Sequence, residues 1–273
     1  KKESTDRGRK TGSRFHWKPD KQVFTDINIP VDYYRDVLRR QAVVNKGITF
    51  KFRNQVGKKF EEEEYCYENG IRQYIEEMVG DNAFTMPAYW ETERRGRDAE
   101  NRPEMKLKIT ASFCFSKQVS HIEYYHNSSW LEYGGAPEKA AKSAFVSALD
   151  AYLKQTGKYQ KNESKISWND ISDSLILVTN GFSTLTSYEN QTKKSITNKF
   201  IYEAMVDFLR QCLEVYFIEN KADAEKIAEQ VLINKRSREK SEKDKREYHA
   251  KSDRLGMLTA MAKDMEGFSR AVK

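Results

Sequence analysis

The sequence predicts an α+β fold, in which a mostly antiparallel sheet packs against helices and a long helical extension follows at the C-terminal end. Polar and apolar residues alternate over 105–115, which is the period of a strand with one covered face. Apolar residues recur at helical spacing over 137–152 and again over 201–213. Residues 235–254 then carry nine basic and five acidic side chains with almost nothing apolar, which is typical of a helix that crosses solvent.

The first part of the chain predicts a short strand followed by a helix. Residues 13–17 fit a strand that ends before Pro19. A helix is expected over 31–45, because proline suits the start of a helix and Pro30 stands there, and because Gly47 can cap its end.

Residues 48–67 predict an antiparallel hairpin. Apolar and polar residues alternate over 48–53, and a turn over 54–57 leads into a return strand. Four successive glutamates, 61–64, lie on the return strand and cannot all face one side. We therefore expect an exposed strand edge there, and no metal site.

The remaining elements follow the same two periods. They are a short helix over 71–78 ended by Gly80, a charged solvated loop over 91–101, the strand over 105–115, a helix over 137–152 ended by Gly157, a strand buried on both faces over 175–178, and the helix over 201–213. The extension is expected as a helix over about 220–254, whose apolar stripe stops at Leu232. A last short helix over 255–268 would need a partner to cover its apolar side chains.

The composition excludes several classes of protein. The chain has 273 residues and a net charge of +7, and its 14 Phe, 15 Tyr and 4 Trp argue against disorder. No apolar run is long enough for a membrane span or a signal peptide, so a cytoplasmic protein without membrane contact is expected. The three cysteines lie far apart and predict reduced thiols rather than a metal site. The basic excess is compatible with a nucleic-acid partner without requiring one.

No motif of a complete active site is present. The sequence contains no phosphate-binding P-loop, dinucleotide-binding glycine motif, HExxH zinc motif or GxSxG nucleophile motif, and its four histidines are scattered. The segment over 188–194 is the exception in chemical terms, because Lys193 and the amide of Gln191 could both donate hydrogen bonds to a terminal phosphate. A solvated polar loop is the alternative for this segment.

Several motifs in the same order resemble those of one protein family. The matching segments are 11–20 (TGS, then F, W and PD), 45–48 (NKGI), 67–71 (YENGI), 133–135 (YGG) and 189–193 (ENQTK) with Asn198. Together they resemble the transducer segment of the ATPase subunit of bacterial type IIA DNA topoisomerases, the gyrase B/ParE family. The resemblance implies a ribosomal-protein-fold-like transducer sandwich and a part in ATP-dependent DNA strand passage and topology change.

The resemblance also implies roles for individual residues. Lys193 corresponds to a lysine that contacts the γ-phosphate of ATP, and Gln191 stands beside it in the same loop. Thr192 would shape that loop, and Ser13 takes the place of a threonine that faces the adenine end of the nucleotide pocket. Asn190 departs from the glycine that the family has there. ATP and Mg are the cofactors implied for the intact protein, with none expected on this chain alone.

On this resemblance the chain divides into the end of an ATPase domain (1–20), a transducer domain (21–218) and a long helix and linker leading toward a TOPRIM domain (219–273). It is expected to be a fragment of an ATP-hydrolysing topoisomerase that lacks both the ATPase and the TOPRIM catalytic sites. The expected partners are double-stranded DNA, the topoisomerase A subunit of the gyrase A or ParC type, and a second copy of the ATPase subunit through the ATPase domain. The predicted DNA contacts are Lys235, Arg236, Arg238, Lys240, Lys243, Lys245 and Arg246.

Two other hypotheses fit part of the sequence. A mismatch-repair or chaperone member of the same ATPase superfamily would share the fold and a phosphate-contacting lysine, although the Asn-Lys-Gly and Gln-Thr-Lys strings favour the topoisomerase. A free-standing basic nucleic-acid-binding module would bind a duplex tightly by itself and would not depend on Lys193.

Overall fold

The structure is a computed structural model that describes the backbone of residues 11–271 and the side chains of residues 11–247 and 251. The side chains of the predicted last helix, 255–268, lie outside the described residues. Among the described residues, no helix is both long and apolar enough to cross a membrane.

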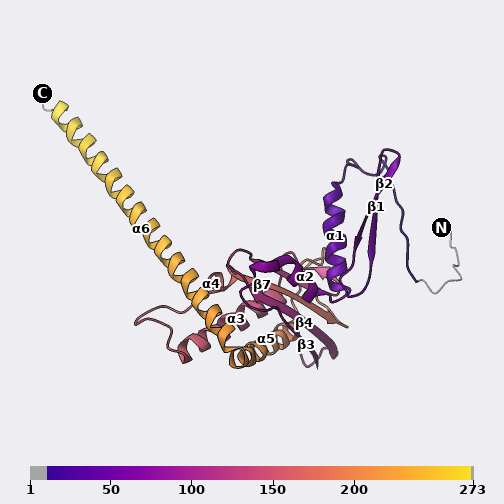
Figure 1. The fold of residues 1–273 in the computed structure, drawn as a ribbon. Coiled ribbons are helices and arrows are strands. Elements are labelled where there is room, and N and C mark those ends of the chain that lie inside the picture. Colours follow the sequence, from indigo (N-terminus) through magenta and orange to yellow (C-terminus); the bar gives the residue numbers. More distant parts are fainter. Residues whose placement is uncertain (1–10, 272–273) are drawn as a thin grey trace.

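The centre of the molecule is a five-stranded sheet with the strand order β3-β4-β7-β5-β6 (Figure 1). Its strands are β3 (Ala88–Gly96), β4 (Met105–Phe115), β5 (His121–His126), β6 (Ser129–Trp130) and β7 (Leu175–Ser183). Only the β5–β7 pair is parallel, so the sheet is mostly antiparallel, as predicted. The strand predicted over 105–115 is β4 itself.

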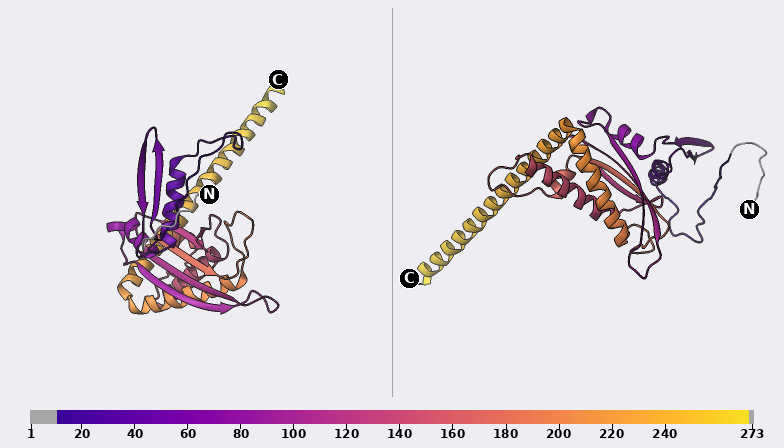
Figure 2. Two further views of the ribbon diagram at one scale, coloured as in Figure 1. Left: turned by 90° about the vertical axis from the view of Figure 1, so that its right-hand side faces the viewer. Right: turned by 90° about the horizontal axis from the view of Figure 1, so that it is seen from below.

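Helices cover both faces of this sheet. One face packs against α3 (Ala136–Gln155), α5 (Lys199–Glu219) and the first turns of α6 (Lys221–Ala271) in a single apolar core (Figure 2). The other face packs against α2 (Ile71–Val79) and the end of α1 (Val31–Val44). The strand β7 lies between the two cores, because alternate residues of its first half point into each. This confirms the prediction of a strand buried on both faces.

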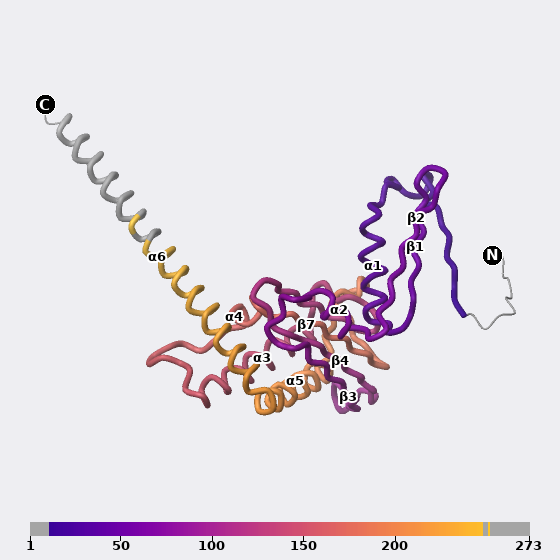
Figure 3. Tube along the Cα trace, in the orientation of Figure 1, coloured from indigo at the N-terminus to yellow at the C-terminus, as the bar shows by residue number. Residues whose placement is uncertain are grey.

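The helix α1 and the hairpin of β1 (Phe50–Val56) and β2 (Lys59–Tyr65) stand away from the sheet (Figure 1). The acidic run of β2 is exposed except for Glu63, which is half-buried, and two of the other acids pair across the hairpin with basic residues of β1. On the opposite side of the sheet, α6 extends far beyond the body of the molecule (Figures 1 and 3).

The structure corrects three predicted elements. The helix expected separately over 255–268 is the continuation of α6, whose backbone runs unbroken from Lys221 to Ala271. Residues 13–17 form no strand, and the side chains of Phe15 and Trp17 are exposed with no sheet to cover them. The predicted loop over 91–101 begins as the second half of β3, an edge strand. In the sequence this segment looks like a loop because it is rich in charged residues. In the structure Glu91 and Glu93 point to solvent, while the residues that alternate with them face α5. Glu93 also pairs with Lys106 of β4 at 2.8 Å.

Candidate functional site

Residues 184–198, which we call the Lys193 loop, connect β7 to α5. The end of this loop is held firmly in the body of the molecule. Ile196 is fully buried and forms isolated bridges with Gly135 and Tyr188. Its carbonyl oxygen accepts a hydrogen bond of 2.8 Å from the N–H of Ala136, the first residue of α3.

The side chain of Asn198 ties the same end of the loop together. It is buried, its Oδ1 accepts a hydrogen bond from the Ser187 N–H at 2.7 Å, and its Nδ2 donates to Asp98 at 2.6 Å. Asp98 in turn accepts the N–H of Phe200 in the first turn of α5 at 2.9 Å. The asparagine that follows the Gln-Thr-Lys string thus acts as a fixed point of the loop.

The tip of the loop is a tight turn organised by Asn190. The Oδ1 atom of Asn190 accepts hydrogen bonds from both the N–H and the hydroxyl of Thr192, and its carbonyl oxygen accepts the N–H of Lys193 at 3.2 Å. Lys193 has a φ of +57°, a left-handed conformation that reverses the chain at that residue. Thr192 thus donates two of the three hydrogen bonds that form the tip, and its role in shaping the loop stays a prediction.

The two adjacent lysines at the tip are in different electrostatic situations. The Lys194 ammonium forms an ion pair with Glu132 and lies 5.6 Å from the ring centre of Tyr133. Its hydrogen bond with Glu132 raises the pKa of Lys194. The Lys193 side chain is exposed and has no ion pair with any described residue, and its ammonium lies 5.7 Å from the ring centre of Tyr188. Lys193 therefore projects a free positive charge from a loop with a fixed base.

The other two predicted nucleotide contacts are also accessible. Gln191 is exposed beside Lys193, and its amide makes no hydrogen bond to a described residue. Ser13 is exposed in the irregular segment that precedes α1. The structure places Gln191 and Lys193 together, but shows no contact between Ser13 and the loop. Within the described residues no cluster of side chains could hold a metal ion.

Of the seven predicted DNA contacts on α6, three pair with described carboxylates outside this helix and four do not. The prediction for Lys235 must be corrected. Lys235 is 0% exposed, and its ammonium lies 3.2 Å from Glu163 and 3.1 Å from Glu239. Arg236 forms two hydrogen bonds of 3.0 Å with Glu163. The burial of Lys235 removes it from the predicted set.

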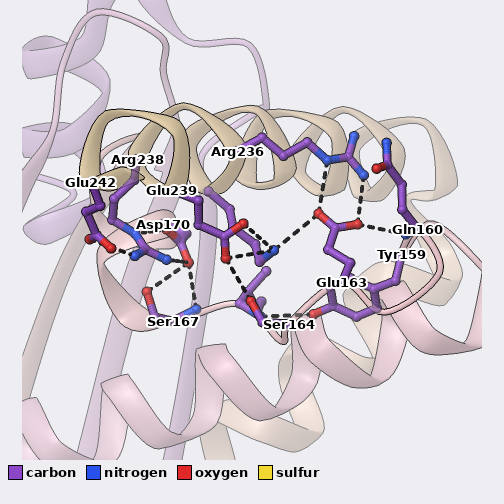
Figure 4. A network of polar contacts seen from close by, with 12 residues as sticks. Tyr159, Gln160, Glu163, Ser164, Ser167, Asp170, Arg236, Arg238, Glu239 and Glu242 are labelled. Carbon is purple, nitrogen blue, oxygen red and sulfur yellow. Dashed lines mark hydrogen bonds and ion pairs between the residues drawn. The ribbon is translucent and has the colours of Figure 1, made fainter. Parts of the chain in front are cut away.

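Arg238 is bound in the same way, to a different carboxylate. It donates to both oxygens of Asp170, at 2.7 and 3.2 Å, and to Glu242 at 3.0 Å (Figure 4). Because Arg236 and Arg238 are neutralised within the molecule, they anchor α6 rather than offer free charge to DNA. Arg236 is exposed beside its carboxylate partner, whereas Lys240, Lys243, Lys245 and Arg246 are exposed and pair with no described carboxylate outside α6. Lys243 lies 3.9 Å from Glu247 of the same helix.

The pKa values of the anchoring carboxylates reflect these contacts. Hydrogen bonds from Arg236 lower the pKa of Glu163 to about 2, helped by the Gln160 N–H and Lys235 and opposed by burial. Burial alone would raise the pKa of Asp170, but hydrogen bonds from Arg238 and Ser167 outweigh it and the pKa lies below its ordinary value. Both groups are therefore ionised at neutral pH.

Acid should weaken the attachment of α6. Because the folded pKa of Glu163 lies below its ordinary value of 4.5, its ionic contacts stabilise the fold fully above about pH 4.5, and this stabilisation is lost as the pH falls toward 2. In urea denaturation, Glu163→Gln should lower the midpoint at neutral pH and make it less dependent on acid pH. The same change at exposed Glu214 is the control, and identical pH profiles for the two variants would contradict this expectation.

Comparison with known proteins identifies the family. A family model described as DNA gyrase B matches residues 70–247, well over half of the chain. The chain belongs to the DNA gyrase B family. The match includes the whole Lys193 loop and all seven predicted DNA contacts of α6, whereas α1, the hairpin and Ser13 precede it.

Similar proteins extend the likeness to most of the chain. The DNA gyrase B protein of Mycoplasmoides gallisepticum is 25% identical over 86% of this chain, and that of Streptococcus pyogenes serotype M1 is 24% identical over 84%. This chain spans only 37% and 34% of the length of those relatives.

Solved structures share the fold. The 43K ATPase domain of Thermus thermophilus gyrase B, in complex with an aminocoumarin, has a TM-score of 0.59 at 21% identity and covers 84% of this chain and 59% of its own. The topoisomerase IV ATP-binding domain of Francisella tularensis, in complex with a small-molecule inhibitor, has a TM-score of 0.62 at 22% identity and covers 81% of this chain and 57% of its own.

Sequence reasoning missed the two carboxylates that anchor α6, Glu163 and Asp170. Asp170 carries one local signal, since Ser167 and Asp170 form a capping box at the start of α4 (Trp168–Ser172). Nothing near Glu163 in the sequence indicates its role, because its two basic partners, Lys235 and Arg236, are more than seventy residues away.

Proposed function

We propose that this chain is the transducer of a gyrase B/ParE-type ATPase subunit of a type IIA topoisomerase, in which Lys193 reports whether the terminal phosphate of ATP is present. The observation that carries the proposal is the free ammonium of Lys193 at the tip of a loop whose base is fixed in the body of the molecule. A lysine of this kind donates charge-assisted hydrogen bonds to phosphate oxygens, and the amide of Gln191 adds a neutral donor beside it.

The strength of such a contact suits a switch. One hydrogen bond to a charged group contributes about 1.5–3 kcal/mol. That free energy shifts a two-state equilibrium roughly tenfold to a hundredfold, so loss of the phosphate would release the loop without unfolding it. The intact protein would bind ATP with Mg, and Lys193 and Gln191 would supply donors for the phosphate.

The remaining parts of the chain would connect this sensor to DNA. On the proposed division into residues 1–20, 21–218 and 219–273, the sensor would lie in the transducer and the exposed basic residues on the helix that follows. Double-stranded DNA, a gyrase A or ParC type subunit and a second ATPase subunit would be the partners, in the cytoplasm. Contacts through Lys240, Lys243, Lys245 and Arg246 would go to phosphates and be weakened by salt. The ion pairs of the other three basic residues count against a free-standing basic module.

Replacing Lys193 with alanine tests the sensor. In the intact ATPase subunit, Lys193→Ala should lower the rate of ATP hydrolysis roughly tenfold to a hundredfold, because one charged contact to the phosphate is lost. The matched control is Lys194→Ala, which removes the neighbouring charge that Glu132 already neutralises. Equal rates for Lys193→Ala and the unmodified protein would reject the sensor role, as would an equal loss in both variants.

A further inference from the structure

The turn between β5 and β6 lies at the edge of the sheet, between α1 and the start of the Lys193 loop. Its two central residues, Asn127 and Ser128, have φ values of +46° and +61°. Two successive left-handed residues joining the paired residues His126 and Ser129 make the tight hairpin turn that matches the twist of a sheet. The two residues of the turn form hydrogen bonds to different elements.

Ser128 contacts α1. Its carbonyl oxygen accepts a hydrogen bond from the side-chain amide of Gln41 at 2.8 Å, and its hydroxyl donates to Asn45 Oδ1 at 3.2 Å. Gln41 lies in the last turn of α1, and Asn45 directly follows the helix. Because α1 and its hairpin otherwise stand away from the sheet, their attachment is concentrated at this end (Figure 1).

Asn127 contacts the start of the Lys193 loop. Its Oδ1 accepts the N–H of Ser183 at 2.9 Å, and its Nδ2 donates to the Ser183 carbonyl at 3.2 Å and to Thr186 Oγ1 at 2.9 Å. The hydroxyl of Ser183 also lies 2.8 Å from Nε2 of the buried His126. One side chain thus holds the last residue of β7 and the third residue of the loop together.

We propose that Asn127 is a positioning residue for Lys193, and that the Asn127–Ser128 turn transmits displacements of α1 to the Lys193 loop. The reason is geometric: each half of one two-residue turn is hydrogen-bonded to a different element, so α1 cannot shift against the sheet without moving the turn or breaking its bonds. The end of the loop is fixed independently, through Asn198 and Asp98. Through this turn, the position of α1 would influence the phosphate sensor of the proposed function. The biological meaning of this coupling rests on that proposed function.

Amide hydrogen exchange in the 273-residue chain tests the positioning role. The reporters are the amides of Glu189 and Thr197, which donate to Ser195 and Ser187 across the loop at 3.0 and 2.9 Å. Asn127→Gly keeps the left-handed backbone but removes the side chain, and should speed exchange at both amides about tenfold. Asn162→Gly is the matched control, because Asn162 has a φ of +64° in the loop between α3 and α4 and should leave both amides unchanged.

A double substitution tests the transmission itself. Gln41→Ala should speed exchange at Glu189 roughly threefold when Asn127 is present and should have no effect when residue 127 is glycine. A merely structural role for Asn127 predicts instead that the two effects multiply. An unchanged loop in Gln41→Ala, or the same factor in both backgrounds, overturns the proposal.

Two features keep this test interpretable. The first is Asn127→Asp, which keeps the acceptor for the Ser183 N–H but loses both amide donations, so its exchange rates at Glu189 and Thr197 should lie between those of the wild-type chain and Asn127→Gly. The second is exchange in β4, which checks that every variant is folded. No nucleotide is used. A negative result in the exchange experiment therefore does not contradict the role of Lys193 as a phosphate sensor. A negative result with Lys193→Ala does not contradict the coupling between α1 and the loop.

Discussion

Gly135→Ala is expected to lower the free energy of unfolding by about 2–6 kcal/mol and to displace the end of the Lys193 loop. Gly135 has φ +84° and ψ −133°, a conformation that costs other residues roughly 1–3 kcal/mol. A Cβ atom there would lie 2.3 Å from the Ile196 carbonyl oxygen and 2.7 Å from Ser195 Oγ. Relieving that overlap adds about 1–3 kcal/mol, because backbone rather than a flexible side chain has to move.

Gly157→Ala is the control for this substitution. Gly157 also has a left-handed φ, +64°, but a Cβ atom there would meet nothing within 4 Å. Its replacement should therefore cost only about 1 kcal/mol, which comes from the backbone conformation alone. Urea denaturation of both variants measures the difference. Equal losses would mean that Ile196 does not hold the loop in the way the structure indicates.

The fold could be predicted from the sequence wherever one periodicity ran without interruption. The strand over 105–115 and the helix over 137–152 were predicted because a single apolar face decides each of them. The strand β3 was missed because its outward face carries charges that look like a loop, and only pairing with β4 reveals their alternation. The short strand over 13–17 was predicted wrongly, since local alternation cannot show whether a neighbouring strand exists.

The candidate site was predictable only through resemblance, and its supports were not predictable. Spacing alone leaves Lys193 in an ordinary polar loop. The structure distinguishes the two adjacent lysines. Lys194 is paired with Glu132, sixty-two positions earlier in the sequence, whereas Lys193 has no ion pair with a described residue. The basic run of α6 shows the same limit. Lys235 and Lys245 look equivalent in the sequence, yet the first is buried and the second exposed. The difference comes from carboxylates that the fold brings from another segment.

Asp170→Ala is expected to lower the free energy of unfolding by about 3 kcal/mol, because it removes a fully buried carboxylate and leaves its partners unpaired. Arg238 would lose both of its bonds to this group, and the N–H and hydroxyl of Ser167 would lose the acceptor that caps α4. Arg238 is 29% exposed and keeps Glu242, so the loss should lie at the lower end of the range for broken buried pairs.

Asp173→Ala provides the comparison, because Asp173 is exposed at the end of the same helix and should change stability by less than about 0.5 kcal/mol. Arg238→Ala and the double variant complete a thermodynamic cycle in urea. If the pair anchors α6, the double variant should lose less stability than the two single losses added together. Strict additivity would mean that Asp170 acts only as the cap of α4. The ionic attachment of the long helix to the body would then depend on Glu163 and on Lys158, whose ammonium lies 2.8 Å from Glu225 of α6.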